Sequence, residues 1–124
     1  MLKDAYLEVE KRVYQVAKQM GASITNSYHC FGKEKYPDAI SLYFELRFCE
    51  VKRKIRISDH VEQHKNEPGQ KDVKSMTIYK KIKLDAVERF VRNRINEMKK
   101  ATISIAFKKI EKQARNYPTL PSIA

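Results

Sequence analysis

A few histidine and aspartate side chains are the groups of this chain that could hold a metal ion or move a proton. Asp59 and His60 are adjacent, and His64 lies four positions further on. His29 and Asp38 come from two earlier segments. Imidazole and carboxylate groups bind Zn²⁺ and other transition metals, and a histidine beside a carboxylate is also an acid–base pair. These five residues raise the hypothesis of a metal site or a hydrolytic centre, provided that the fold gathers them.

The segment 39–60 has to position most of these groups. Both of its halves, before and after Cys49-Glu50, alternate apolar and polar residues, which is typical of half-buried strands. A turn over Cys49-Glu50 pairs Phe44 with Ile55 on an apolar face and gathers the cations of both halves on the other face. A slip by one residue would exchange the two faces, so this register is well specified. We predict an antiparallel hairpin with a basic outer surface.

The same register brings Asp59 and His60 beside Asp38, at one end of the predicted sheet. The preceding strand should end at the same edge and carry His29 there, with His64 close by in sequence. A simpler alternative is a strand-end turn in which Ser58 and Asp59 bond their own backbone.

A nuclease-like string also occurs in this segment. Pro37-Asp38, followed by Glu50-Val51-Lys52, matches the PD-(D/E)xK pattern of metal-dependent nucleases. That chemistry needs both carboxylates on one metal ion. The predicted hairpin puts Asp38 and Glu50 at opposite ends of a strand, about 33 Å apart at the usual rise per residue. We therefore do not expect a nuclease of this kind.

The rest of the chain predicts two helices and two more strands. An apolar stripe at helical spacing covers residues 3–20, and Gly21 should end that helix with positive φ. Asp85 and Glu88 suggest a capping box at the start of a second helix that runs to about Ala114. Residues 102–107 also alternate like a strand, but the helical spacing around them favours a helix.

Strands are expected at 22–31 and 75–82, and a long loop at 61–74. The predicted order is α-β-β-β-β-α. We expect a single α+β domain over residues 1–116, with an antiparallel sheet of about four strands and both helices packed on one of its faces. Two prolines predict an extended or disordered tail at 117–124.

The charge is strongly asymmetric along the chain. Residues 1–50 carry seven basic and seven acidic side chains, whereas residues 51–124 carry 19 basic and 8 acidic ones, so the net charge of +11 lies in the second part. Such an excess predicts a polyanionic partner, or else only a solubilising surface. We expect no secretory signal, no membrane partner, a cytoplasmic location, and a monomer or small homo-oligomer.

Two basic surfaces are candidates for contact with that partner. The outer face of the hairpin is the first choice, and one face of the second helix is the second. The hairpin residues are Tyr43, Arg47, Lys52, Lys54 and Arg56, and the helix residues are Arg89, Arg92 and Lys100. Single-strand binders combine such cations with stacking rings.

The run Lys54–His60, with Ser27-Tyr28 upstream, resembles a signature of small uncharacterised proteins from phages and mobile elements. In those proteins a Ser/Tyr strand precedes an Ile-Arg-Ile-Ser-Asp-His strand end. The resemblance implies a short accessory protein that binds nucleic acid or inhibits a host defence nuclease such as a CRISPR effector.

The leading hypothesis is therefore a non-enzymatic basic binding protein that needs no cofactor. Its partner would be nucleic acid or the acidic nucleic-acid-binding groove of another protein. The alternative is a metal-dependent nuclease or hydrolase that uses the His/Asp cluster with a divalent metal such as zinc.

Overall fold

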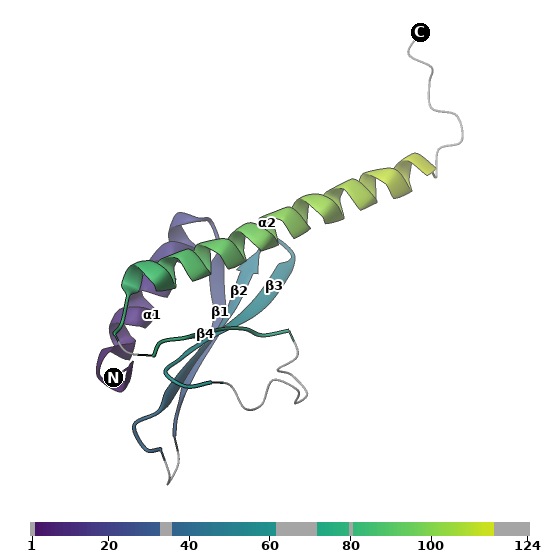
Figure 1. Cartoon of the computed structure of the whole chain (residues 1–124). Coiled ribbons are helices and arrows are strands. Elements are labelled where there is room, and N and C mark those ends of the chain that lie inside the picture. Colours follow the sequence, from purple (N-terminus) through teal and green to yellow (C-terminus); the bar gives the residue numbers. More distant parts are fainter. Residues whose placement is uncertain (1, 33–35, 62–71, 80, 116–124) are drawn as a thin grey trace.

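The computed structural model describes residues 2–32, 36–61, 72–79 and 81–115. The order of elements is α1 (Leu2–Gln19), β1 (Ser23–Phe31), β2 (Ile40–Phe48), β3 (Val51–Ser58), β4 (Lys74–Thr77) and α2 (Leu84–Arg115). The predicted α-β-β-β-β-α order of a small single domain is confirmed (Figure 1). The predicted tail at 117–124 and most of the predicted loop at 61–74 lie outside the described residues.

The central hairpin has the register that the alternation predicts. β2 and β3 are antiparallel, with Phe44 opposite Ile55 and Tyr43 opposite Arg56. The turn over Cys49-Glu50 is tight, and Cys49 takes a positive φ of 53°. β1 pairs antiparallel with β2, with an irregularity between Ile24 and Asn26.

The fourth strand overturns the prediction of a purely antiparallel sheet. The strand order is β1-β2-β3-β4, but β4 runs parallel to β3, from Lys74 opposite Ile55 to Thr77 opposite Ser58. The sheet is therefore mixed. Parallel pairing needs a long crossover, and the 15 positions between Ser58 and Lys74 supply it. We name the face covered by the helices the inner face and the opposite one the outer face.

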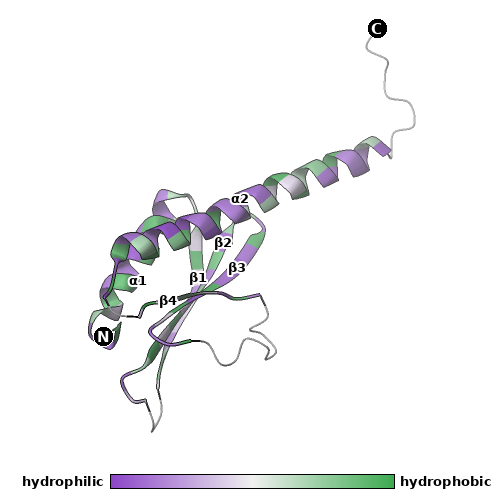
Figure 2. Ribbon diagram, in the orientation of Figure 1, coloured by the Kyte–Doolittle hydropathy of each residue, from purple (hydrophilic) through white to green (hydrophobic). Residues whose placement is uncertain are grey.

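The core lies between the inner face and the two helices. Apolar residues of β2 and β3, such as Leu42 and Ile57, are buried against Val13 of α1 and Ile95 of α2 in one continuous cluster. In Figure 2 apolar and polar residues alternate along α1 and α2, as expected of helices that bury one side. Gly21 follows α1 with φ of 75°, as its position predicts.

The second helix is longer than the domain needs. It continues through residues 102–107, which confirms the helix over the strand there, and its second half extends past the sheet (Figure 1). The predicted capping box is wrong: the carbonyl of Lys83 accepts from the amides of Ala86 and Val87, so the helix begins before Asp85. Asp85 instead lies 3.7 Å from Arg12 of α1. No described helix has the length and apolar content to cross a membrane.

Candidate functional site

The structure brings together only part of the predicted His/Asp cluster. Asp59 and His60 are in contact, with Oδ1 of Asp59 3.0 Å from Nδ1 of His60. Asp38 is exposed and forms an ion pair with Lys3 instead. His29 packs its ring against Tyr6, with 5.1 Å between centroids, and His64 lies outside the described residues. Among the described residues, no three His, Cys, Asp or Glu side chains are grouped to hold a metal.

The carboxylates of the nuclease-like string are also apart. Asp38 precedes the first residue of β2, and Glu50 follows its last residue. Glu50 forms an ion pair with Lys109 of α2, 3.2 Å away. The hairpin therefore places these two carboxylates at opposite ends of β2, as the register predicts.

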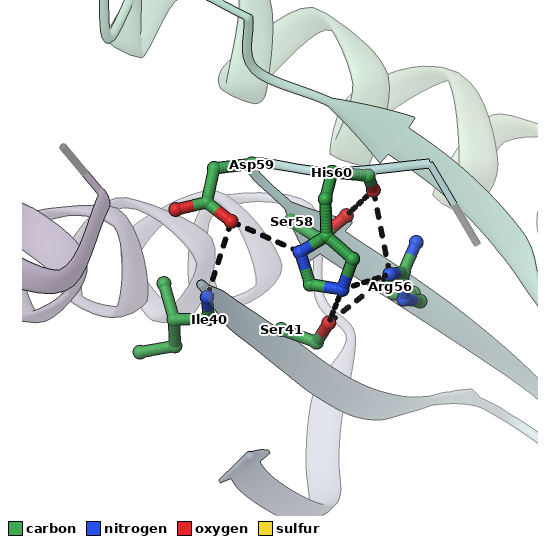
Figure 3. A network of polar contacts seen from close by, with 6 residues as sticks. All are labelled: Ile40, Ser41, Arg56, Ser58, Asp59 and His60. Atoms are coloured by element: carbon green, nitrogen blue, oxygen red, sulfur yellow. Dashed lines mark hydrogen bonds and ion pairs between the residues drawn. The ribbon is translucent and has the colours of Figure 1, made fainter. Parts of the chain in front are cut away.

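A buried arginine organises the residues around His60 (Figure 3). Arg56 is only 2% exposed, so the prediction that it projects into solvent is wrong. Its Nη2 donates to Ser41 Oγ at 3.1 Å and contacts His60 Nε2 at 3.2 Å. In the register Arg56 lies opposite Tyr43 of β2 and Ser75 of β4, and the parallel pairing with β4 was not predicted.

This network has the composition of an acid–base site, but the contacts of His60 differ from those that a general base needs. A guanidinium only donates hydrogen bonds, so the contact with Arg56 makes His60 Nε2 an acceptor and leaves the proton on Nδ1, which donates to Asp59. Asp59 Oδ1 also accepts from the amide of Ile40 at 3.1 Å, and Ser58 Oγ donates to the carbonyl of His60 at 2.6 Å. Nε2 is the nitrogen that would have to take a proton from Ser41, 3.4 Å away, and the buried cation already occupies it. These hydrogen bonds fix the end of β3 against the start of β2.

The outer face carries a pair of stacked tyrosines in place of the single ring that was predicted. Tyr28 of β1 lies opposite Tyr43 of β2, with ring centroids 4.7 Å apart and planes within 12°. Tyr28 is 48% exposed. Partial burial, then the nearby Tyr43 and Cys30, raise the pKa of the Tyr28 phenol, so it stays neutral well into the alkaline range. The pair offers an uncharged aromatic surface.

A basic groove begins beside the tyrosines. Its volume is about 810 Å³, and it is lined by residues of the sheet, of the segment just before β4 and of α2: Glu45, Lys52, Arg53, Lys54, Asp72, Val73, Lys74 and Arg94. A smaller pocket holds Tyr28 and Tyr43 and shares Glu45, Lys54 and Val73 with this groove. The tyrosine pair and the basic groove therefore form one continuous surface.

Glu97 of α2 orders one wall of the basic groove. It binds Lys74 at 2.6 Å and Arg94 at 2.9 Å, while Arg94 also donates to the carbonyl of Asp72. Hydrogen bonds from Lys74 and then Arg94 lower the pKa of the Glu97 carboxyl. Both cations are therefore held in ion pairs, and the single charge of Glu97 offsets one of their two charges.

The opposite wall keeps its charge. Arg53 donates to the carbonyl of Lys52 and makes no ion pair with another described residue. Neither Lys52 nor Lys54 forms an ion pair within the described part of the chain, and both are exposed. The acid on this side, Glu45, accepts a hydrogen bond from Thr25 at 2.7 Å. Three cations of β3 are thus available to a ligand.

The backbone of β3 is open at the same place. β4 pairs only with Ile55–Ser58, so among the described residues the first half of β3 has no strand on that side. The carbonyl of Ser58 accepts from Ile78, so the even-numbered residues turn their backbone groups away from β2. By the alternation of a strand, Lys52 and Lys54 turn their backbone N–H groups toward the basic groove, while the carbonyl of Lys52 accepts from Arg53.

The remaining residues predicted to contact a partner lie on two different elements, β2 and α2. Arg47 is exposed at the end of β2, where its Nε donates to the carbonyl of Cys49. Arg92 bonds Gln19 of α1 at 2.8 Å and Glu88 at 3.4 Å, so it connects the two helices. Arg89 and Lys100 are exposed on α2, away from the outer face. The cations predicted on the second helix therefore do not extend the basic groove.

Sequence reasoning missed four groups of this surface: Tyr28, Arg53, Lys74 and Arg94. Tyr28 was considered only as part of the resemblance that includes Ser27-Tyr28, because the strand predicted at 22–31 was given no register. Arg53 falls on the inner side by parity and reaches the basic groove because the sheet ends there. Lys74 and Arg94 could be assigned to the basic groove only with the parallel pairing of β4, and nothing in the sequence predicts that pairing.

Comparison of the chain with protein-family models, with curated proteins and with solved structures gives no match in any of the three. The fold and the surface define a small α+β domain with a mixed sheet and a basic groove. A function for it has to rest on the geometry of its own residues.

Proposed function

We propose that the protein is a non-enzymatic binding module that holds a single strand of nucleic acid on its outer face. Phosphates would lie along Lys52, Arg53 and Lys54, and a base would stack on Tyr28. The observation that carries this proposal is the continuity of the stacked tyrosines with the basic groove. Rings combined with a cationic track are the usual means of binding single strands.

The charge distribution supports a phosphate backbone as the ligand of the basic groove. Two of its five cations are held by Glu97, and the other three face the opening without ion-pair partners among the described residues. The open edge of β3 adds backbone N–H groups, which bind phosphate oxygens in many complexes. A neutral Tyr28 phenol does not repel them.

A single strand fits better than a duplex because bases in a duplex are already stacked on one another. Tyr28 can accept a base only if that base is free. The partly exposed ring of Tyr28, next to the half-buried Tyr43, offers a stacking surface for one base. It does not offer a helix that could enter the major groove of a duplex.

Fluorescence anisotropy with labelled DNA and RNA oligonucleotides of about 16 nucleotides, single-stranded and as hairpin duplexes, tests the proposal. Tyr28→Leu should weaken single-strand binding by about 5- to 150-fold, since stacking on an aromatic contributes about 1–3 kcal/mol per base. Tyr36→Leu is the matched control, because Tyr36 is 65% exposed and lies in the turn before β2. Equal binding of single strands and duplexes, or equal loss in both variants, would contradict the proposal.

A further inference from the structure

The second half of α2 leaves a row of large apolar side chains in water. Ile103 is 58% exposed, Phe107 63% and Ile110 61%. Each residue from Ile103 to Arg115 is exposed, and Figure 1 shows this part of the helix extending past the sheet. Apolar side chains grouped in this way usually mark a contact surface.

The spacing of these residues is that of a helix–helix seam. Ile103, Phe107, Ile110 and Ala114 follow one another at intervals of four, three and four residues. Those are the d, a, d and a positions of two heptads, the positions at which two helices pack knobs into holes. We name these four residues the seam.

The seam faces away from the domain. On an ideal helix with about 100° per residue, Ile105 lies nearly opposite the centre of the seam. Ile105 lines a hollow of about 190 Å³ with Cys49 and Val51 at the β2–β3 turn. Lys109, on the same side as Ile105, pairs with Glu50. The domain therefore holds one side of the helix and leaves the seam open.

The charges beside the seam indicate what covers it. The flanking e and g positions hold Ser104, Ala106, Glu111 and Gln113, so no cation borders the seam between residues 103 and 115. The four cations of this part occupy the b, c and f positions: Lys108, Lys109, Lys112 and Arg115. An acidic groove gripping the seam would not reach them, whereas a second seam meets no like charge.

We propose that the seam pairs with the seam of a second copy of this chain in an antiparallel, two-fold dimer. Phe107 then lies against Ile110 of the other copy, and Ile103 against Ala114. The antiparallel direction keeps two domains of net charge +11 at opposite ends of the pair. The dimer is independent of the function proposed above.

The contact is small, so the dimer is weak. Two helices with about 20 Å of seam bury less than the roughly 800 Å² per partner of a standard interface. Because both copies are strongly basic, added salt screens their repulsion and strengthens the dimer. Binding to nucleic acid responds to salt in the opposite direction, which separates the two effects.

Sedimentation equilibrium over protein concentrations from about 10 µM to about 1 mM, at about 0.05 and 0.5 M NaCl, tests the proposal. The average mass should rise from 14.6 kDa toward twice that value with concentration, more so at high salt. Phe107→Ser should weaken association about tenfold or more, with helical circular dichroism unchanged. Ala114→Leu, which enlarges the seam, should strengthen association about tenfold.

Leu7→Ser is the matched control, since Leu7 is 65% exposed on α1, away from the seam. It should leave association unchanged. A wild-type chain that stays monomeric at about 1 mM in both salts overturns the proposal. So does a dimer that survives Phe107→Ser unchanged, or one that Leu7→Ser abolishes, because either would use another face.

Discussion

Replacing Lys52 and Lys54 together by glutamine should change how binding of a single strand depends on salt. Each neutralised phosphate of a single strand contributes about 0.7 to the slope of log K against log salt. Among the described residues, the cations of the basic groove without an ion pair are these two lysines and Arg53. The wild-type slope should therefore be about −2 and that of the variant about −0.7. Lys74 and Arg94 should contribute less, because both are already held in ion pairs with Glu97.

Anisotropy titrations at several salt concentrations measure the two slopes. Between 0.05 and 0.2 M salt, the wild-type affinity should fall about 20-fold and that of the variant about 3-fold. Replacing Lys11 and Lys18 by glutamine removes the same charge from the exposed side of α1 and is the matched control. Equal slopes for the wild type and the groove variant, or an equal loss in the control, would refute the assignment of phosphates to this groove.

Two further predictions concern the groups that hold the surface in shape. The contacts that lower the pKa of the Glu97 carboxyl also stabilise the fold. This stabilisation is complete above the ordinary pKa of glutamate and is lost as pH falls through the lowered pKa. Glu97→Gln should therefore lower Tm near neutral pH, and the difference in Tm from wild type should vanish in acid. A pH-independent difference would contradict this. Arg56→Met should raise Tm or leave it unchanged, since two buried nitrogens of Arg56, Nε and Nη1, lack hydrogen-bond partners in the described structure and each such donor costs about 1–3 kcal/mol. Its affinity for single strands should stay within about twofold, and a larger loss would make this buried arginine part of the binding surface.

The hairpin was predictable because two independent patterns agreed. Apolar alternation placed Phe44 and Ile55 inside, and the charges on the other face fitted the same register. The helix boundary at Gly21 and the helical state of 102–107 also follow from local spacing. Local chemistry of this kind is visible in the sequence.

The pairing of β4 was not predictable in the same way. Four residues from Lys74 to Thr77 carry no alternation that distinguishes parallel from antiparallel pairing. That one contact buries Arg56, which alternation alone assigned to solvent, and it brings Lys74 and Arg94 to the basic groove. The errors over Arg56, Lys74 and Arg94 therefore share a single long-range cause.

The shortness of β4 also explains why the basic groove lies where it does. A longer strand would pair with all of β3 and close the edge at Lys52 and Lys54. Lysines on an open edge commonly serve only to prevent pairing with the strands of other chains. That role alone would require no other groups beside them. Here a stacked tyrosine pair continues the surface. Edge protection alone does not account for these rings, whereas a bound strand with a base stacked on Tyr28 would.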